Sequence, residues 1–223
     1  MNVQLVNYSQ VPRYIYEDTP STMLDMIAYC ARVSNPANQN NKETSEKLVK
    51  YLINNQHWSP LETVSMCLEI ETTRDIARQM LRHRSFSFQE FSQRYADPSA
   101  LDTMFAIREA RLQDTKNRQN SVELTSEQQQ LANAWEETQR HVIATTKSAY
   151  EWALKNGIAK EQARAVLPEG LTMTKMYMNG TIRSWVHYIE LRSAHGTQKE
   201  HIEIAQACAE VLSIYFPLDI LKA

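Results

Sequence analysis

The segment 63–72 alternates between apolar and polar side chains, and this alternation constrains the fold more than any other feature of the chain. Val64, Met66, Leu68 and Ile70 would share one side of an extended backbone, because successive side chains of a strand point to opposite faces. The residues between them are Ser65, Cys67, Glu69 and Glu71. The segment therefore predicts a strand with one buried face.

The apolar period becomes helical directly after this strand. Ile76, Ala77, Met80 and Leu81 recur at helical spacing, which predicts a helix at 73–82. Periodicity and capping residues predict the other elements: a strand at 3–6, helices at 21–33, 43–55, 131–154, 158–166, 181–192 and 197–214, and a strand at 171–178 that is broken by Asn179 and Gly180. Residues 109–129 are charged and rich in glutamine, and we expect them to form an exposed helix.

The long helix at 131–154 is expected to bury one stripe of side chains. That stripe consists of Leu131, Trp135, Val142, Ala149 and Ala153. A chain of 223 residues lies within the size of one domain. The elements together predict an α+β fold, a single compact domain over residues 1–223 with a mainly antiparallel sheet flanked by long helices.

Composition argues against several classes of partner. The net charge is −2, so the chain as a whole attracts neither nucleic acid nor an anionic membrane. No apolar run approaches the roughly 20 residues of a membrane span, and the first residues lack the pattern of a secretion signal. Only four glycines occur, without a Gly-x-Gly-x-x-Gly or P-loop pattern, so a bound nucleotide would have to be held by side chains.

The cysteines indicate a reducing compartment. Cys30, Cys67 and Cys208 are far apart, odd in number and without metal-ligand spacing, so we expect reduced thiols, a cytoplasmic protein and no metal site. Cys67 lies on the predicted strand and Cys208 in an apolar helix stripe, which favours a packing role for both.

The run 82–95 is unusually dense in polar side chains. Guanidinium groups bind phosphate through paired hydrogen bonds, and hydroxyl and amide groups bind sugars. Arg74, Arg78 and Arg82 fall four residues apart on one edge of the preceding helix. That edge is compatible with a solvated, salt-bridged surface. However, it leads into further arginines with few acids between them, which favours a bound anion that relieves their mutual repulsion.

This run also resembles a family signature. Arg82-His83-Arg84, seven further residues and then Ser92-x-Arg94-Tyr95 are similar to the signature of the flavin-dependent thymidylate synthases. Three other segments resemble segments of the same family: Ala31-Arg32-Val33-Ser34, Ala163-Arg164-Ala165-Val166-Leu167-Pro168, and His187 to Arg192 followed by Thr197-Gln198-Lys199-Glu200. The resemblance covers most of the chain from Ala31 onward.

The resemblance implies a role for each matched residue. The predicted nucleotide-binding residues are Gln79, Arg82, Glu90, Ser92, Gln93, Arg94, Arg164 and Arg192. The predicted flavin-binding residues are Ser34, Arg82, His83, Arg84, Glu90 and His187. The predicted catalytic positions are Arg192, which would polarise the pyrimidine ring, and Ser92, which would lie close to the ring but has no evident base beside it in sequence and is therefore assigned to binding.

The reaction that the resemblance implies is the reductive methylation of dUMP to dTMP. Methylenetetrahydrofolate would donate the carbon, and FAD reduced by NADPH would donate the hydride. The family forms its active sites between the subunits of a homotetramer, so the resemblance implies the same assembly here. Thr63 stands where many relatives carry a histidine, which leaves flavin stacking to Tyr95 or Trp58. Gly196 also stands where many relatives carry a histidine, and the nearest histidine here is His195.

Three other functions compete with this prediction. A nucleic-acid binder could use the arginines together with Phe86, Phe88 and Phe91 to bind phosphates and stack bases, although the net charge is negative. A flavoprotein that acts on another nucleotide is compatible with Thr63. An oligomeric scaffold with a degenerate site is disfavoured, because the matched arginines are all present.

Overall fold

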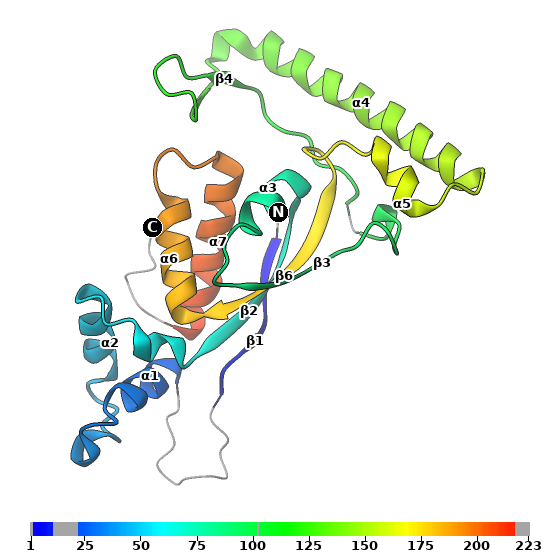
Figure 1. Ribbon diagram of the computed structural model, residues 1–223. Helices are drawn as coiled ribbons and strands as arrows, with labels where there is room; N and C mark the ends of the chain where they lie inside the picture. Colours follow the sequence, from blue (N-terminus) through cyan, green and yellow to red (C-terminus); the bar gives the residue numbers. More distant parts are fainter. Residues whose placement is uncertain (1, 11–21, 102, 217–223) are drawn as a thin grey trace.

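An antiparallel sheet of four strands lies between the helices, and its strand order is β1-β2-β6-β3 (Figure 1). The structure is a computed structural model, and it describes residues 2–10, 22–101 and 103–216. The strands are β1 (Asn2–Tyr8), β2 (Ser65–Thr73), β6 (Met173–Thr181) and β3 (Ser87–Glu90). This arrangement confirms the predicted α+β class and the antiparallel sheet.

Strand β2 has the buried face that its alternation predicts. Val64, just before the strand, and Met66, Leu68 and Ile70 within it are almost completely buried. The three residues within the strand pair on both sides; Leu68, for example, lies opposite Leu5 of β1 and Met178 of β6. Burial of this apolar face is the main driving force for packing helices against the sheet.

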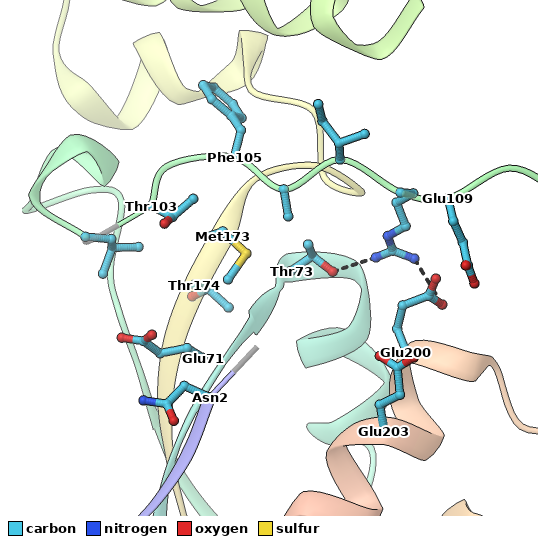
Figure 2. A pocket seen from close by; sticks show the side chains of 14 residues that line it. Asn2, Glu71, Thr73, Thr103, Phe105, Glu109, Met173, Thr174, Glu200 and Glu203 are labelled. Carbon is cyan, nitrogen blue, oxygen red and sulfur yellow. Dashed lines mark hydrogen bonds and ion pairs between the residues drawn. The ribbon is translucent and has the colours of Figure 1, made fainter. Parts of the chain in front are cut away.

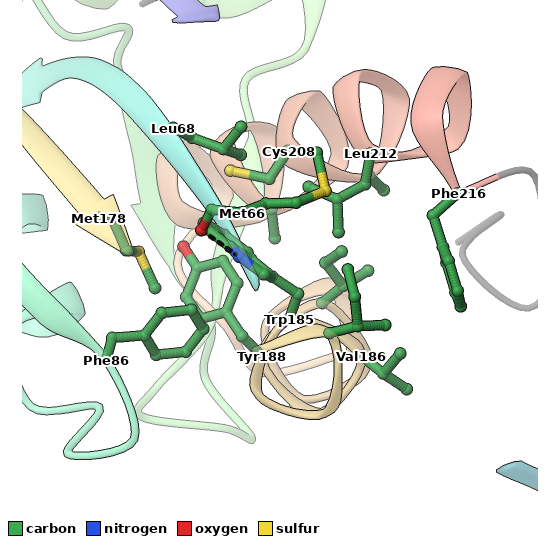
Figure 3. Packing of buried hydrophobic residues seen from close by; sticks show 14 of the residues in the cluster. Met66, Leu68, Phe86, Met178, Trp185, Val186, Tyr188, Cys208, Leu212 and Phe216 are labelled. Carbon is green, nitrogen blue, oxygen red and sulfur yellow. Dashed lines mark hydrogen bonds between the residues drawn. The ribbon is translucent and has the colours of Figure 1, made fainter. Parts of the chain in front are cut away.

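Helices α6 (Ile182–Ser193) and α7 (Lys199–Tyr215) pack with the sheet around one core (Figure 3). Trp185 lies at its centre, fully buried, and donates a hydrogen bond from Nε1 to the carbonyl of Met66 at 3.1 Å. Cys208 is part of the same core, and burial raises the pKa of its thiol. The packing roles predicted for Cys67 and Cys208 are confirmed, because both are buried.

The remaining predicted helices form with small shifts at their ends. They are α1 (Met23–Ala31), α2 (Ser45–Asn54) and α3 (Arg74–Met80). Thr22 caps α1 through a capping box with Asp25, whereas the alternative cap, Ser21, lies outside the described residues. Short 3-10 turns occupy η1 (Pro36–Asn38), η2 (Ser59–Glu62) and η3 (Pro98–Ala100).

The long helix is present, but its predicted buried stripe is right only near the C-terminal end, where Ala153 is buried. Helix α4 (Gln129–Lys155) ends where Gly157 adopts φ +77°, as the sequence predicts. Leu131, Trp135 and Val142 are nevertheless 49%, 43% and 39% exposed. The reason is visible in Figure 1, where α4 lies away from the sheet and meets α5 (Lys160–Ala163) and η5 (Arg164–Val166).

The helix expected at 109–129 is also wrong. This segment forms a small hairpin of β4 (Arg111–Gln113) and β5 (Ser121–Glu123), followed by η4 (Ser126–Gln128). The Asp114 carboxylate accepts hydrogen bonds from the backbone of Lys116 and Asn117, which stabilises a turn in preference to a helix.

Two strands differ from their predicted extent. Strand β6 continues through Asn179 and Gly180 instead of ending before them, because Asn179 pairs with β2 and β3 on both sides. The polar run, expected to be irregular, contributes β3 to the edge of the sheet. Because β3 lies inside the polar run, the residues before β3 and the residues after it lie against different parts of the molecule.

Gly180 has a steric role that connects β6 to the polar run. A Cβ atom at Gly180 would lie 2.4 Å from Cδ1 of Phe86, whose ring is buried against Trp185 at a centroid distance of 4.8 Å. We expect Gly180→Ala to lower the free energy of unfolding by about 1–3 kcal/mol through overpacking. Urea unfolding measures the loss. Gly170→Ala is the matched control, since its Cβ would meet no atom within 4 Å; equal stability of the two variants would contradict the prediction.

Candidate active site

The polar run begins at the end of α3 and is anchored by Phe86. The backbone N–H of His83 donates to the carbonyl of Met80, and that of Phe86 donates to the carbonyl of His83. Phe86 is buried in the core, so the residues just before it are held in a fixed loop. Arg82 and Arg84 are exposed, and neither has an ion-pair or hydrogen-bond partner within the described part of the chain.

The structure brings two predicted residues together from positions 109 apart in sequence. Arg192, near the end of α6, donates a hydrogen bond from Nε to Nε2 of His83 at 2.9 Å. Burial, Arg192 and Arg82 lower the pKa of His83 from 6.5 to about 4. The imidazole is therefore neutral at pH 7 and accepts through Nε2, in agreement with the expectation that neighbouring arginines disfavour its charged form.

A buried polar network lies beside this pair, and the sequence analysis did not predict it. Gln79 donates from Nε2 to Oε1 of Gln198 at 2.8 Å, and its Oε1 lies 3.2 Å from Nδ1 of His201. The other ring nitrogen of His201 lies 3.1 Å from the hydroxyl of Tyr188. His201 falls in the apolar stripe of α7 with Ala205, Cys208 and Leu212, and a polar residue on a buried stripe is the signal that could have revealed the network.

The expectation that the arginines of α3 lack acidic partners is wrong. Arg74 is paired with Glu90 at 3.3 Å and with Glu169 at 3.4 Å. Arg78 is paired with the same two carboxylates, at 3.5 Å and 3.0 Å. Glu90 also accepts a hydrogen bond from Thr174 at 3.0 Å. Glu169 is distant in sequence, so it could not be recognised as a partner, and the unpaired positive charge begins only at Arg82.

A second group of predicted residues lies beyond β3. Arg94 is near Glu161 at 3.8 Å, and Arg164 donates from Nε to the backbone carbonyl of Glu161 at 3.3 Å. Gln93 is buried, and its Nε2 has no hydrogen-bond partner among the described residues. The segment after β3 and the short α5–η5 turn therefore hold Arg94 and Arg164 close to one another.

No hydrogen bond or ion pair among the described residues joins His187 or Ser34 to either group. His187 is exposed on α6 and contacts Trp58, with ring centroids 4.3 Å apart and the ring planes tilted by 54°. Both residues line a hollow of about 690 Å³ between the end of α2 and α6. Ser34 is exposed in the turn after α1, and Ser92 is half-buried between β3 and η3.

A separate cavity of about 450 Å³ lies where β2 ends and β6 begins (Figure 2). Its lining includes Glu71, Glu200 and Glu203, and Arg108 is paired with Glu200 at 3.5 Å. None of the predicted site residues lines this cavity among the described positions. Within one chain the predicted residues therefore fall into separate groups.

The buried imidazole of His201 gives a prediction for acid stability. Burial, Arg192 and His83 lower its pKa from 6.5 to about 3. Below pH 6.5 the unfolded chain binds a proton here that the folded chain does not, so the stabilisation is complete above pH 6.5 and is lost as the pH falls toward 3. His201→Asn cannot titrate at this position. When the pH is lowered from 7 to 5, we expect the free energy of unfolding of the wild type to fall by about 2 kcal/mol more than that of His201→Asn. Urea unfolding at both pH values measures this difference, and parallel losses would contradict it.

The structure gives two findings on membranes and metals. Within residues 2–10, 22–101 and 103–216, no helix is both long enough and apolar enough to cross a bilayer. The same residues contain no group of three or more histidine, cysteine, aspartate or glutamate side chains arranged to hold a metal ion.

Comparisons with known proteins agree with the signature. Residues 17–218 match the family described as "Thymidylate synthase complementing protein". The "Probable flavin-dependent thymidylate synthase" of Paramecium bursaria Chlorella virus 1 is 52% identical over 197 residues, which is 88% of each chain. The "Flavin-dependent thymidylate synthase" of Synechocystis sp. is 45% identical over 218 residues, 97% of this chain and 96% of the relative.

A solved structure has the same fold. The UMP/dUMP methylase PolB from Streptomyces cacaoi, bound with 5-Br dUMP, superposes with a TM-score of 0.77 over 99% of this chain and 92% of its own. Its sequence identity is 24%, so this likeness supports the fold. The sequence matches extend over nearly the whole chain, and the chain belongs to the Thymidylate synthase complementing protein family, the family of the flavin-dependent thymidylate synthases.

Proposed function

We propose that this protein is a flavin-dependent thymidylate synthase, which methylates dUMP to dTMP with methylenetetrahydrofolate as the carbon donor. The observation that carries the proposal is the 52% and 45% identity to proteins of that name over 88% and 97% of the chain. FAD, reduced by NADPH, supplies the hydride that completes the methyl group. The protein itself has to bind, orient and electrostatically stabilise the reactants.

Three arginines in and near the polar run are suited to the nucleotide phosphate. Arg82 is exposed at the end of α3 without an acidic partner in the described residues, and Arg94 and Arg164 lie together beyond β3. A phosphate placed among these guanidinium groups would neutralise their repulsion and accept paired hydrogen bonds. Gln93, with a buried N–H lacking an acceptor, and Ser92 would complete the nucleotide contacts. Glu90, whose Oε1 pairs with Arg74 and whose Oε2 pairs with Arg78, would bind the sugar through the remaining lone pairs of these oxygens.

Arg192 and His83 would act at the reacting rings. His83 is neutral and accepts a hydrogen bond from Arg192, so the charge of the pair stays on the guanidinium group. A fixed cation beside a uracil carbonyl stabilises the negative charge that develops when the ring becomes a nucleophile. We assign this role to Arg192, and we assign flavin contact to His83.

The available side chains fit a flavin. Arg84 is an exposed cation without a partner in the described residues, which suits a phosphate of FAD, and Ser34 offers a hydroxyl group. His187 and Trp58 form a tilted aromatic pair beside a hollow, which suits contact with a flat ring. These residues would bind and orient the cofactor.

We also propose a homotetramer with shared active sites. In one chain, strand β3 lies between the group of Arg94 and Arg164 and the pair of His83 and Arg192, no hydrogen bond or ion pair among the described residues joins them, and the proposed site needs both (Figure 1). Helix α4 exposes several large apolar side chains, and a surface of this kind is typical of subunit contacts. They are Leu131, Trp135, Val142 and Trp152. A fully active monomer in light scattering would contradict the assembly.

The visible spectrum of the purified protein tests the proposed function. We expect a yellow protein whose colour is bleached by NADPH under anaerobic conditions, and restored when dUMP and methylenetetrahydrofolate are added together. The two additions made separately are the controls. Colour restored by another nucleotide but not by dUMP would indicate a flavoprotein of other specificity, and a colourless protein with salt-dependent affinity for single-stranded RNA would indicate a nucleic-acid binder.

A further inference from the structure

The polar network beside the proposed site has a defined direction, and it begins two residues before a buried carboxylate. Glu200 is buried, and its carboxylate is paired with Arg111 and Arg108. Burial alone would raise its pKa, but its own backbone N–H, Arg108, the Gln198 side chain and Arg111 together lower it. Glu200 is therefore an anion at pH 7 and accepts hydrogen bonds only.

The contacts between the side chains give the orientation of both amides. Gln198 lies two residues before Glu200, and its amide oxygen Oε1 faces Gln79. Gln79 then donates from Nε2 to that oxygen at 2.8 Å, and its own Oε1 faces His201. Reversing either amide would place two donors or two acceptors against each other.

His201 completes the chain in one tautomer. Because Oε1 of Gln79 carries no hydrogen, Nδ1 of His201 must be the donor across 3.2 Å. The bare Nε2 then accepts the hydroxyl hydrogen of Tyr188 across 3.1 Å. His201 is completely inaccessible to solvent, so water cannot replace either partner.

The orientation of Gln79 has a consequence for ligand binding. Its amide nitrogen carries a second hydrogen, for which the described residues provide no acceptor. Gln79 is half-buried one turn before Arg82, on the helix that leads into the polar run. The second hydrogen is thus available to an acceptor on a bound nucleotide.

We propose that His201 is a positioning residue, whose Nδ1–H holds the Gln79 amide with its nitrogen turned toward the nucleotide. The inference rests on the proposed function, because only there is Gln79 a nucleotide-binding residue. His201 does not touch the substrate, and it acts through Gln79.

Two amide substitutions at His201 test its hydrogen bond to Gln79 and its hydrogen bond to Tyr188 one at a time. His201→Asn places an amide nitrogen where Nδ1 lies and keeps the donor to Gln79, whereas His201→Gln places its amide where Nε2 lies and keeps only a partner for Tyr188. In the FAD-loaded full-length protein, we expect His201→Gln to weaken dUMP binding about tenfold, the effect of one hydrogen bond, and His201→Asn to stay within about threefold of the wild type. Isothermal titration with dUMP measures both.

A double-variant cycle tests whether the effect passes through Gln79. We expect Gln79→Ala combined with His201→Gln to bind dUMP no more weakly than Gln79→Ala alone. Equal affinities of His201→Asn and His201→Gln, or additive losses in the cycle, would overturn the inference while wild-type dUMP binding remains normal. A wild-type protein that does not bind dUMP would instead overturn the proposed function, and this inference with it.

The tautomer itself provides a readout that does not depend on activity or on the folding of a variant. Long-range ¹H–¹⁵N correlation of histidine-labelled wild-type protein is expected to show the His201 hydrogen on Nδ1, with Nε2 bare. His201→Asn identifies the signal by its disappearance. Observation of the hydrogen on Nε2 would overturn the proposed direction of the network.

Discussion

Arg192→Ala is expected to reduce turnover by about 100-fold or more, while dUMP binding weakens by less than about tenfold. A cation aimed at developing charge contributes mainly to the transition state, and its removal therefore affects kcat more than affinity. The phosphate would still be bound by Arg82, Arg94 and Arg164. Single-turnover oxidation of the reduced flavin and titration with dUMP measure the two quantities separately.

Two further variants define what Arg192 contributes. Arg192→Lys keeps the positive charge but lacks the guanidinium Nε–H that His83 accepts, so we expect an intermediate loss of turnover. Arg140→Ala is the matched control, because Arg140 is an exposed arginine of α4 that pairs with Glu136 one turn away, and we expect it to retain wild-type turnover. Equal losses of turnover and of dUMP affinity in Arg192→Ala would contradict the assigned role.

Removal of Arg192 also has a spectroscopic consequence. Arg192 is one of the groups that lower the pKa of His83 to about 4. In Arg192→Ala the pKa of His83 is therefore expected to rise toward 6.5, although burial and Arg82 still hold it below that value. A histidine titration by NMR follows this change, which a loss of turnover through misfolding would not produce in an otherwise native spectrum.

The sheet and its helices could be predicted because their patterns are local. The alternation of β2 and the helical periods of α1, α3, α6 and α7 each arise from one buried face, and a buried face leaves its period in the sequence. The caps at Thr22 and Thr181 mark helix starts for the same reason, since the first turn needs acceptors nearby in sequence.

The errors have a common physical origin in contacts between distant residues. The 109–129 segment is rich in helix-forming residues, yet its hairpin is tied to α7 by Arg111 with Glu200 and by Lys199 with Glu123. Helix α4 has an apolar stripe of the usual kind, but the described residues cover only its C-terminal end, at Ala153. Periodicity shows that a stripe exists and does not identify what packs on it.

The arrangement of the predicted site residues could not be derived from the sequence. The signature identified His83 and Arg192 separately, and only the fold shows that they share a hydrogen bond. Glu169 belongs to no signature segment, yet it pairs with Arg74 and Arg78 and removes them from the set of free cations. His201 was missed because a histidine among apolar residues of a helix is usually interpreted as part of the core.

Because the two arginine groups are separate within one chain, we expect a large difference in turnover between single-variant tetramers and mixed tetramers. If Arg164 of one subunit completes a site that contains Arg192 of another, then Arg164→Ala and Arg192→Ala damage different halves of each site. Each variant alone is expected to be nearly inactive. Tetramers assembled at random from both chains would contain both natural arginines at about a quarter of their sites, and would recover about a quarter of wild-type turnover. Co-expression with two different tags, followed by purification on both, isolates the mixed tetramers for assay.

A pair of substitutions within one group is the control for this recovery. His83 and Arg192 are joined by a hydrogen bond inside a single chain, so every chain of a His83→Ala and Arg192→Ala mixture has a damaged pair. That mixture is expected to remain as inactive as its parents. Recovery in the first mixture without recovery in the second requires Arg164 to reach Arg192 across a subunit boundary. A mixed Arg164→Ala and Arg192→Ala tetramer that binds FAD but shows no recovery would instead place both arginines of each site in the same chain.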